Sequence, residues 1–311
     1  MKIKYRANIL PRIIYVVIYV ILSLYYSLTA NISGDTEVYK SIFEHGNLFN
    51  FGIEVVTPII FLLIKSIGLS FESFLFLTLM LWLPIPFYMA RFFDNPLSKL
   101  VCFSFFLTPF FSSNAFSLIR QYYGALFFFY YIFSNDKKRI LFVFLMFLSH
   151  VSSIIWLVFS SKLVAEFVFK IRLYLFGVSI WLIVLSQILF TYFIETIAKY
   201  RYFGADNEFI SRILGKMDYY ISDNYVKEPL SLKFLVVNII FIFIFSFFIR
   251  YSRELSLKEK QFTSVFVCSS LVALALSFNL ILSVRLGFMS VALSYLLAAF
   301  SFRQVFMSYK L

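Results

Sequence analysis

The feature that most constrains this chain is a succession of long apolar segments separated by short polar ones. A helix needs about 20 apolar residues to cross the hydrocarbon core of a membrane, and about ten such runs follow one another here. Of the 311 residues, 61% are hydrophobic and 14% are charged. Soluble domains are only about half apolar and about a quarter charged. The sequence therefore predicts an all-α polytopic membrane protein with a single integral membrane domain, residues 1–311.

The apolar runs give about ten transmembrane or re-entrant helices, predicted at 13–30, 54–68, 71–90, 97–111, 116–133, 140–159, 173–193, 232–249, 262–282 and 286–302. The ranges 97–111 and 116–133 are predicted to form a hairpin with 112–115 at its tip. Two runs are unusual, because 54–68 is short and contains Pro58 and Lys65, and 140–159 contains His150 among serines. Helix breaks at membrane depth are tolerated where they line a cavity, so we expect both runs to be broken or re-entrant.

Charge places these segments relative to the membrane. The net charge is +12, but the basic residues form short clusters between apolar runs, as in the cytoplasmic loops of membrane proteins. Nucleic-acid binding is therefore rejected, and both termini are expected to be cytoplasmic. Plain alternation of ten spans would put the basic cluster 137–139 outside, whereas two broken runs put every basic cluster inside. The outer side then carries a first loop, 31–53, with an amphipathic helix, and a long loop, 194–231.

Several classes of enzyme are excluded by missing motifs. The two cysteines, Cys102 and Cys268, lie in apolar runs without metal or redox spacing. The sequence contains no Gly-rich phosphate loop and no HExxH, which argues against dinucleotide enzymes, ATP-driven pumps and the usual zinc enzymes. No cofactor is expected.

The segment 110–131 carries Arg120 and Gln121 in an almost wholly apolar and aromatic context. An arginine inside a membrane costs roughly 2.5–3.5 kcal/mol, so it usually faces a partner or a wet cavity. The alternative is an arginine near a helix end whose head reaches the headgroups.

Other candidates for chemistry are Asp35 with Glu37 and Tyr39, then Glu54, His150 and Arg285. Each has an ordinary reading, such as a turn residue, a charge at a helix end or a buried histidine bonded to serine. Taken together they favour chemistry on a phosphorylated substrate. Two arginines can neutralise a diphosphate with bidentate hydrogen bonds, and a carboxylate or a histidine can act as an acid or a base.

Four stretches resemble the motifs of the EpsG family. They are Gly34-Asp35-Thr36-Glu37-Val38-Tyr39, Phe51-Gly52-Ile53-Glu54, Leu118-Ile119-Arg120-Gln121-Tyr122-Tyr123-Gly124-Ala125 and Leu148-Ser149-His150-Val151-Ser152-Ser153. The resemblance covers roughly residues 31–160. It departs at Tyr122-Tyr123-Gly124, where the family more often has small aliphatic residues, and this puts the helix packing there in question.

The family groups bacterial repeat-unit polymerases of the Wzy type, which make O-antigen, capsule or exopolysaccharide. The resemblance implies a GT-C-like architecture in the inner membrane, a polyprenyl-diphosphate-linked glycan as donor and a second lipid-linked unit as acceptor. By the same resemblance, Asp35 matches the position of the acid that activates the acceptor hydroxyl. Arg120, Gln121 and Arg285 are expected to bind the diphosphate, and His150 to share that role or to be an alternative base.

Weaker candidates for substrate binding are Glu37, Tyr39, Glu54 and Arg201. The fold class allows a divalent metal, but the acidic residues are too scattered in the sequence to predict a metal site. A flippase and a chain-length regulator are the expected partners, and no nucleic acid is.

Three other functions are compatible with the span count. They are a GT-C transferase adding one sugar from a polyprenyl-phosphate donor, a membrane acyltransferase, and a lipid-linked glycan transporter (flippase). The first 44 residues contain no histidine, which argues against the acyltransferase. The two halves of the chain show no self-similarity, which argues against an inverted-repeat transporter.

Overall fold

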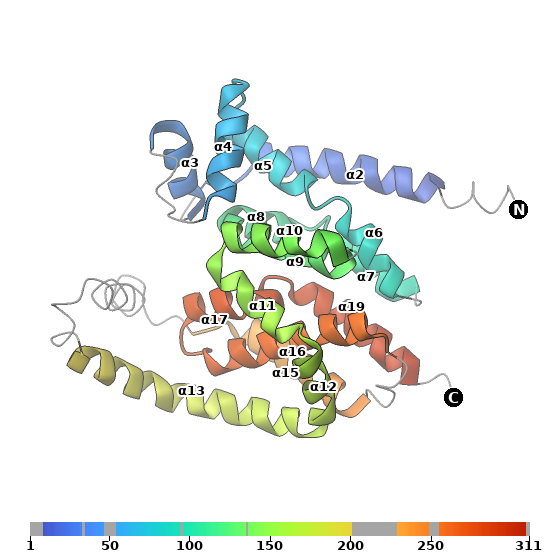
Figure 1. Ribbon diagram of the computed structural model, residues 1–311, viewed down its shortest axis with the longest axis vertical. Helices are drawn as coiled ribbons and strands as arrows, with labels where there is room; N and C mark the ends of the chain where they lie inside the picture. The colour runs from blue at the N-terminus through green and yellow to red at the C-terminus, as the bar shows by residue number, and fades with distance from the viewer. Residues whose placement is uncertain are drawn as a thin grey trace, which may run out of the picture. The chain divides into compact units, whose positions relative to one another are not determined.

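The computed structural model describes residues 9–32, 35–46, 54–93, 96–134, 136–200, 229–248 and 255–308. These residues form helices and connecting segments without a β-strand (Figure 1). The chain divides into two compact units, Met1–Val158 and Phe159–Leu311.

The first unit contains a run of mostly short helices. They are α2 (Ile9–Leu28), α3 (Asp35–His45), α4 (Val56–Ser66), α5 (Phe71–Met80), α6 (Ile85–Met89), η1 (Ala90–Phe92), α7 (Pro96–Phe105), α8 (Pro109–Ser117), α9 (Ile119–Phe133), α10 (Asp136–Ser149), η2 (Val151–Ser153) and α11 (Ile154–Phe159), whose last residue begins the second unit.

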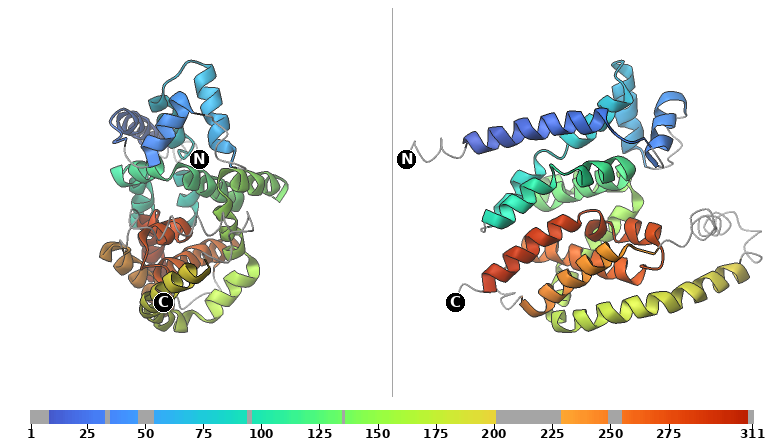
Figure 2. Two further views of the ribbon diagram at one scale, coloured as in Figure 1. Left: turned by 90° about the vertical axis from the view of Figure 1, so that its left-hand side faces the viewer. Right: turned by 180° about the vertical axis from the view of Figure 1, so that it is seen from behind.

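The second unit contains α13 (Arg172–Tyr200), the longest of the described helices. The right-hand view of Figure 2 shows it from the side opposite to that of Figure 1. The others are α12 (Lys162–Lys170), α15 (Leu232–Phe248), α16 (Leu257–Ala275), α17 (Leu280–Leu286), α18 (Phe288–Val291) and α19 (Ser294–Ser308). Helix α15 packs on α13 and α19, and α16 packs on α12, α13 and α18.

Aromatic side chains fill the core of the first unit. Trp82 is fully buried, and its ring lies 5.4 Å from Phe111, 5.6 Å from Tyr122 and 5.6 Å from Phe129, measured between centroids. Edge-to-face contacts at such distances stabilise a core beyond the area they bury. The cluster joins the end of α5 to α8 and α9.

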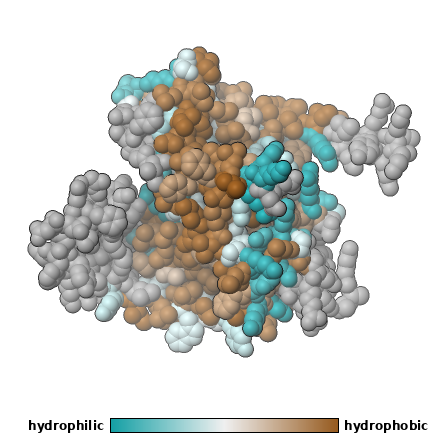
Figure 3. All heavy atoms as spheres, viewed as in Figure 1, coloured by the Kyte–Doolittle hydropathy of each residue, from teal (hydrophilic) through white to brown (hydrophobic). Residues whose placement is uncertain are grey.

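Many apolar side chains stay exposed instead of entering a core. On α2, Ile13 is 52% exposed and Ile21 is 59% exposed, and on α13 Trp181 is 66% exposed. Figure 3 shows hydrophobic side chains over much of the face in view. Exposed apolar surface on this scale suits helices in contact with lipid. The chain is thus all-helical with several apolar helices, as a membrane-embedded protein requires.

The number of spans predicted from the sequence is not confirmed. In the described residues, Leu10–Leu28 and Phe71–Phe92 are long and apolar enough to cross a membrane. Two bent pairs raise the number to four if each is one span: Pro96–Phe105 with Pro109–Ser117, bent by 47°, and Val151–Phe159 with Lys162–Lys170, bent by 57°.

The predicted hairpin tip at 112–115 is wrong, because these residues lie inside α8. Pro109 opens this helix, and the Thr108 side chain caps it by accepting a hydrogen bond from the Phe111 N–H. The polar side chains then bond to their own helix, as in the 2.7 Å bond from Asn114 Nδ2 to the Phe110 carbonyl. The chain turns instead at Leu118, whose φ of −121° and ψ of 42° separate α8 from α9.

Lys65 has a definite structural role. Its ammonium donates to the carbonyls of Phe43 at 2.8 Å and Glu44 at 3.2 Å, in the last turn of α3. A cation satisfies the unpaired carbonyls at a helix C-terminus. Helix α4 ends at Ser66, and two residues later Gly68 has a φ of 76°, the left-handed conformation that glycine adopts readily. Lys65 therefore fixes α3 against α4.

Candidate functional site

Three of the predicted site residues, Glu54, Arg120 and His150, lie together. Glu54 is in the middle, just before α4, and is 8% exposed. Its Oε2 accepts a hydrogen bond from Nη1 of Arg120 on α9. Its Oε1 lies 2.7 Å from Nδ1 of His150, which follows α10. One carboxylate therefore joins two segments that are far apart in the sequence.

Arg120 is held from a second direction by α3. Its Nε donates to the Tyr39 hydroxyl at 2.9 Å, and its guanidinium carbon lies 6.0 Å from the centre of the Tyr39 ring. Tyr39 itself is 3% exposed. The planar guanidinium is thus oriented by a carboxylate and a phenol before any substrate binds.

His150 stands at a break between two helical segments. Helix α10 ends at Ser149, His150 is extended with φ −163° and ψ 120°, and η2 begins at Val151. The break frees the Val151 N–H, which donates to Glu54 Oε1 at 3.2 Å. The Ser153 hydroxyl donates to the His150 carbonyl at 2.6 Å. The predicted break is therefore confirmed at His150, and these hydrogen bonds satisfy the backbone around it.

Gly124 allows α9 to approach this break closely. A Cβ at this position would lie 2.2 Å from the Ser153 hydroxyl oxygen and 3.5 Å from the Trp156 ring. Its neighbour Tyr123 is fully buried and hydrogen-bonds to Thr78 at 2.8 Å. The segment in which the sequence departs from the EpsG pattern is thus part of the packing that holds the site.

The electrostatics of the cluster favour an ionised Glu54. Burial alone would raise the pKa of this carboxyl group. The hydrogen bond to His150, the charge of Arg120 and the Val151 N–H together outweigh burial, so the pKa lies below its ordinary value. At neutral pH the buried arginine therefore has a negatively charged partner.

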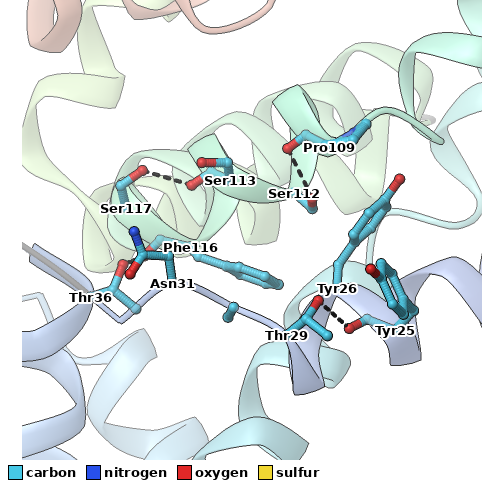
Figure 4. A pocket seen from close by; sticks show the side chains of 11 residues that line it. Tyr25, Tyr26, Thr29, Asn31, Thr36, Pro109, Ser112, Ser113, Phe116 and Ser117 are labelled. Atoms are coloured by element: carbon cyan, nitrogen blue, oxygen red, sulfur yellow. Dashed lines mark hydrogen bonds between the residues drawn. The ribbon is translucent and has the colours of Figure 1, made fainter.

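A cavity of about 420 Å³, drawn in Figure 4, shares helix α3 with this cluster. Its described walls come from the end of α2, from α3 and from α8, and the described residues that line it carry hydroxyl, amide and aromatic groups and no charged side chain. Thr36 lines the cavity and donates to the Phe116 carbonyl at 3.0 Å. Since Thr36 and Tyr39 are about one turn apart on α3, the cavity and the charged cluster are neighbours.

The remaining predicted residues are scattered. Asp35 is half-buried in the first turn of α3, Glu37 is exposed on the same helix, and Gln121 is buried in α9. Arg285 lies near the end of α17, in the second unit, so its pairing with Arg120 stays a prediction. Arg201 lies outside the described residues. Within the described ranges, no three His, Cys, Asp or Glu residues lie close enough together to hold a metal ion.

Sequence reasoning missed two parts of the site. It did not identify the Val151 N–H as a donor to Glu54, and it did not identify the cavity formed by α2, α3 and α8. The signal for the first was present, since a break at His150 must free the N–H groups that follow it. The second had no signal in the sequence, because it depends on how three helices pack.

Comparison with known proteins adds one finding. The model of the EpsG family matches residues 12–310, nearly the whole chain. Neither the comparison with curated proteins nor that with solved structures gave a match. The match extends well beyond the four motifs near the N-terminus and includes Arg285. The chain therefore belongs to the EpsG family.

Proposed function

We propose that this protein polymerises polyprenyl-diphosphate-linked oligosaccharide repeat units at the outer face of the bacterial inner membrane. The product would be an O-antigen, a capsule or an exopolysaccharide. Membership of the EpsG family supports a polymerase of this kind. The observation that carries the proposal is the Glu54–His150–Arg120 cluster beside an uncharged, hydroxyl-rich cavity.

His150 is the proposed general base. Glu54 contacts Nδ1, so a neutral imidazole that donates through Nδ1 leaves Nε2 unprotonated. This is the arrangement in which a carboxylate orients a catalytic histidine. Nε2 takes the proton of the acceptor hydroxyl, the acceptor oxygen bonds to the anomeric carbon of the donor, and the bond from that carbon to the diphosphate breaks. Asp35, at the start of α3, is the alternative base.

Arg120 is proposed to bind the departing diphosphate. Negative charge grows on the bridging oxygen as the glycosidic bond breaks, and a pre-oriented cation stabilises this charge most in the transition state. Glu54 and Tyr39 orient the guanidinium, so little rotamer freedom is lost when substrate binds. The reaction needs no nucleotide, because the diphosphate leaving group supplies the driving force.

The neutral cavity is proposed to hold sugar residues of a lipid-linked unit. Several of its hydroxyls already donate to backbone carbonyls: Thr36 to Phe116, Ser112 to Pro109 at 3.0 Å and Ser117 to Ser113 at 2.7 Å. A hydroxyl that has given its proton still offers oxygen lone pairs as acceptors. Sugar hydroxyls are donors that match such a wall, and the aromatic rings of α2 give them faces to pack on.

The test is polymer assembly from purified lipid-linked repeat units. His150→Gln is expected to lower the rate roughly 100-fold or more, as loss of a general base does. His45→Gln is the matched control, since this histidine is 82% exposed and pairs only with Glu44 at 3.8 Å among the described residues. Asp35→Asn is expected to have a smaller effect than His150→Gln. The opposite order would make Asp35 the base.

A deletion strain tests the reaction class. Single repeat units should accumulate on their lipid at the outer face. Accumulation at the inner face would indicate a flippase instead, and products that grow by one sugar only would indicate a single-sugar transferase.

A further inference from the structure

A second cavity lies near the opposite end of α2 from the hydroxyl-rich one. It has a volume of about 750 Å³ and is walled by the first turns of α2, by the segment from α6 through η1 and by α7. Arg12 on this wall and Tyr25 on the other are about 20 Å apart along the helix axis. Figure 1 shows α6 and α7 beside the N-terminal end of α2.

The polar part of this cavity is cationic. Arg12 from α2, Arg91 from η1 and Lys99 from α7 all line it. Among the described residues, none of the three lies within ion-pairing distance of a carboxylate. Arg91 instead lies over the Tyr88 ring, 5.2 Å from its centre. Three cations from three separate elements therefore share one recess without a described counter-charge.

The apolar part is a cluster of three rings. Tyr15 lies 4.7 Å from Phe103 and 5.5 Å from Phe87, and Phe87 lies 5.4 Å from Phe103, measured between centroids. All three residues line the cavity. Tyr15 is only 9% exposed, and its hydroxyl has no hydrogen-bond partner within the described part of the chain. A buried hydroxyl without a partner is costly, and a bound acceptor would relieve that cost.

We propose that this cavity binds an anionic phospholipid, with the headgroup phosphate held by Arg12, Arg91 and Lys99 and an acyl chain against the rings. Basic pockets between membrane helices take anionic headgroups in this way. The apolar wall distinguishes a lipid from a free phosphate ion, because inorganic phosphate gains nothing from aromatic contacts. The hydroxyl-rich cavity differs in that none of the described residues lining it is a cation, so it is not a second copy of this site.

The experiment uses the full chain purified in detergent, with native mass spectrometry to count bound lipids. Phosphatidylglycerol is expected to bind more tightly than phosphatidylcholine. The triple variant Arg12→Ala, Arg91→Ala, Lys99→Ala should bind phosphatidylglycerol at least roughly tenfold more weakly, because each basic residue adds attraction to the anionic headgroup and screening reduces that attraction. Tyr15→Phe should give a smaller loss, about threefold, as for one hydrogen bond.

A matched triple variant, Lys137→Ala, Lys138→Ala, Lys170→Ala, removes the same charge from residues outside the cavity. It should keep the affinity for phosphatidylglycerol. Equal losses in both triple variants would mean that general surface charge attracts the lipid and would overturn the proposal. Equal binding of the two lipids by the unmodified chain would also overturn it.

Two further measurements distinguish a lipid from a free phosphate ion and do not depend on whether a variant folds. Excess inorganic phosphate should leave phosphatidylglycerol bound, whereas full displacement would identify a free-phosphate site instead. A photoactivatable phosphatidylglycerol, added to the unmodified chain, should crosslink to peptides containing Tyr15 or Phe103. Crosslinks confined to other peptides would contradict the assignment without depending on any variant.

Discussion

The two units of this protein bury polar side chains in different ways. In the first unit, Arg120 and His150 come from separate elements, and the side chain of each bonds to the carboxylate of Glu54. In the second unit, described polar side chains in the core are small and bond mainly to the backbone. Ser283 donates to the Ala273 carbonyl at 2.9 Å, and Asn238 donates to the Phe234 carbonyl at 2.7 Å.

This contrast distinguishes neutral polar side chains from charged ones in the interior of an apolar protein. A serine hydroxyl that donates to a nearby backbone carbonyl already has its hydrogen-bond partner, so it needs no charged side chain beside it. A buried carboxylate costs several kcal/mol unless it is paired, so it persists only where the pairing or the chemistry requires it. The first unit therefore carries the described charged site. The role of Arg285 in the second unit stays a prediction.

The largest expected effect is on Arg120. Compared at matched protein level, Arg120→Ala should lower polymer formation at least about 100-fold, because a cation facing developing charge is lost. Arg120→Lys should restore little, because a point charge does not replace a fork of donors. Arg172→Ala in the second unit is the control, since this arginine donates to the Phe169 carbonyl at 3.2 Å and is expected to be structural. Normal chain length in Arg120→Ala would remove the proposed role.

The next effect is on stability and depends on pH. Glu54→Gln should lower stability by about 3 kcal/mol at neutral pH, as breaking a buried ion pair does. The pKa of Glu54 is lowered in the folded chain, so this stabilisation is full above the ordinary glutamate pKa and is lost as pH falls through the lowered value. The Tm difference between the wild type and Glu54→Gln should therefore shrink below about pH 4.5.

Glu166→Gln gives the comparison from the second unit. Its exposed pair with Lys162, at 3.9 Å, should contribute less than about 1 kcal/mol. If the Tm difference for Glu54→Gln stayed unchanged well below pH 4, the pKa of Glu54 would not be lowered in the folded chain.

A smaller loss is expected from Gly124→Ala. The added methyl overlaps the Ser153 hydroxyl, so this side chain must give up its hydrogen bond to the His150 carbonyl or α9 and η2 must separate. We expect a cost of about 1–3 kcal/mol and a loss of activity as the backbone at His150 loses this support. Gly177→Ala on α13 is the matched control, because nothing lies within 4 Å of the added carbon. It should stabilise by roughly 0.5–1 kcal/mol. Unfolding in detergent and polymer assays on both variants decide the point.

The smallest expected effect concerns the uncharged polar side chains in the core of the second unit. Ser283→Ala should cost about 1 kcal/mol, measured by thermal unfolding, because one hydrogen bond to the Ala273 carbonyl is lost. Polymer formation should be unchanged at matched protein level. A large loss of activity with little loss of stability would show that the second unit also carries part of the reaction.

The sequence predicted the members of the site better than their contacts. Arg120 and His150 stand out because each is an ionisable residue in an apolar context, and the break at His150 follows from its polar neighbours. Glu54, at the centre of the cluster, was only a weaker candidate for substrate binding. The pairing of these three residues could not be predicted, because it depends on how α4, α9 and α10 pack. Tyr39 was a weaker candidate, since nothing in the local pattern shows that its hydroxyl meets Arg120.

The errors about the fold have a common cause. Serines and Asn114 between apolar runs were read as a loop, but such side chains bond to carbonyls three or four residues back and stay helical. Hydrophobic runs also say little about where a helix bends. The break at 106–108 and the turn at Leu118 fall inside or beside apolar stretches, so the predicted boundaries and the number of spans were unreliable.

Glu54 also sets an order of events during synthesis. It precedes Arg120 by 66 residues and His150 by 96 residues. At roughly 5–20 residues per second, the carboxylate waits roughly 3–13 s for its first partner. We expect the nascent chain to keep this side chain protonated or at the membrane surface until Arg120 is made. The site can therefore assemble only after His150 has been made, when about half of the chain has been synthesised.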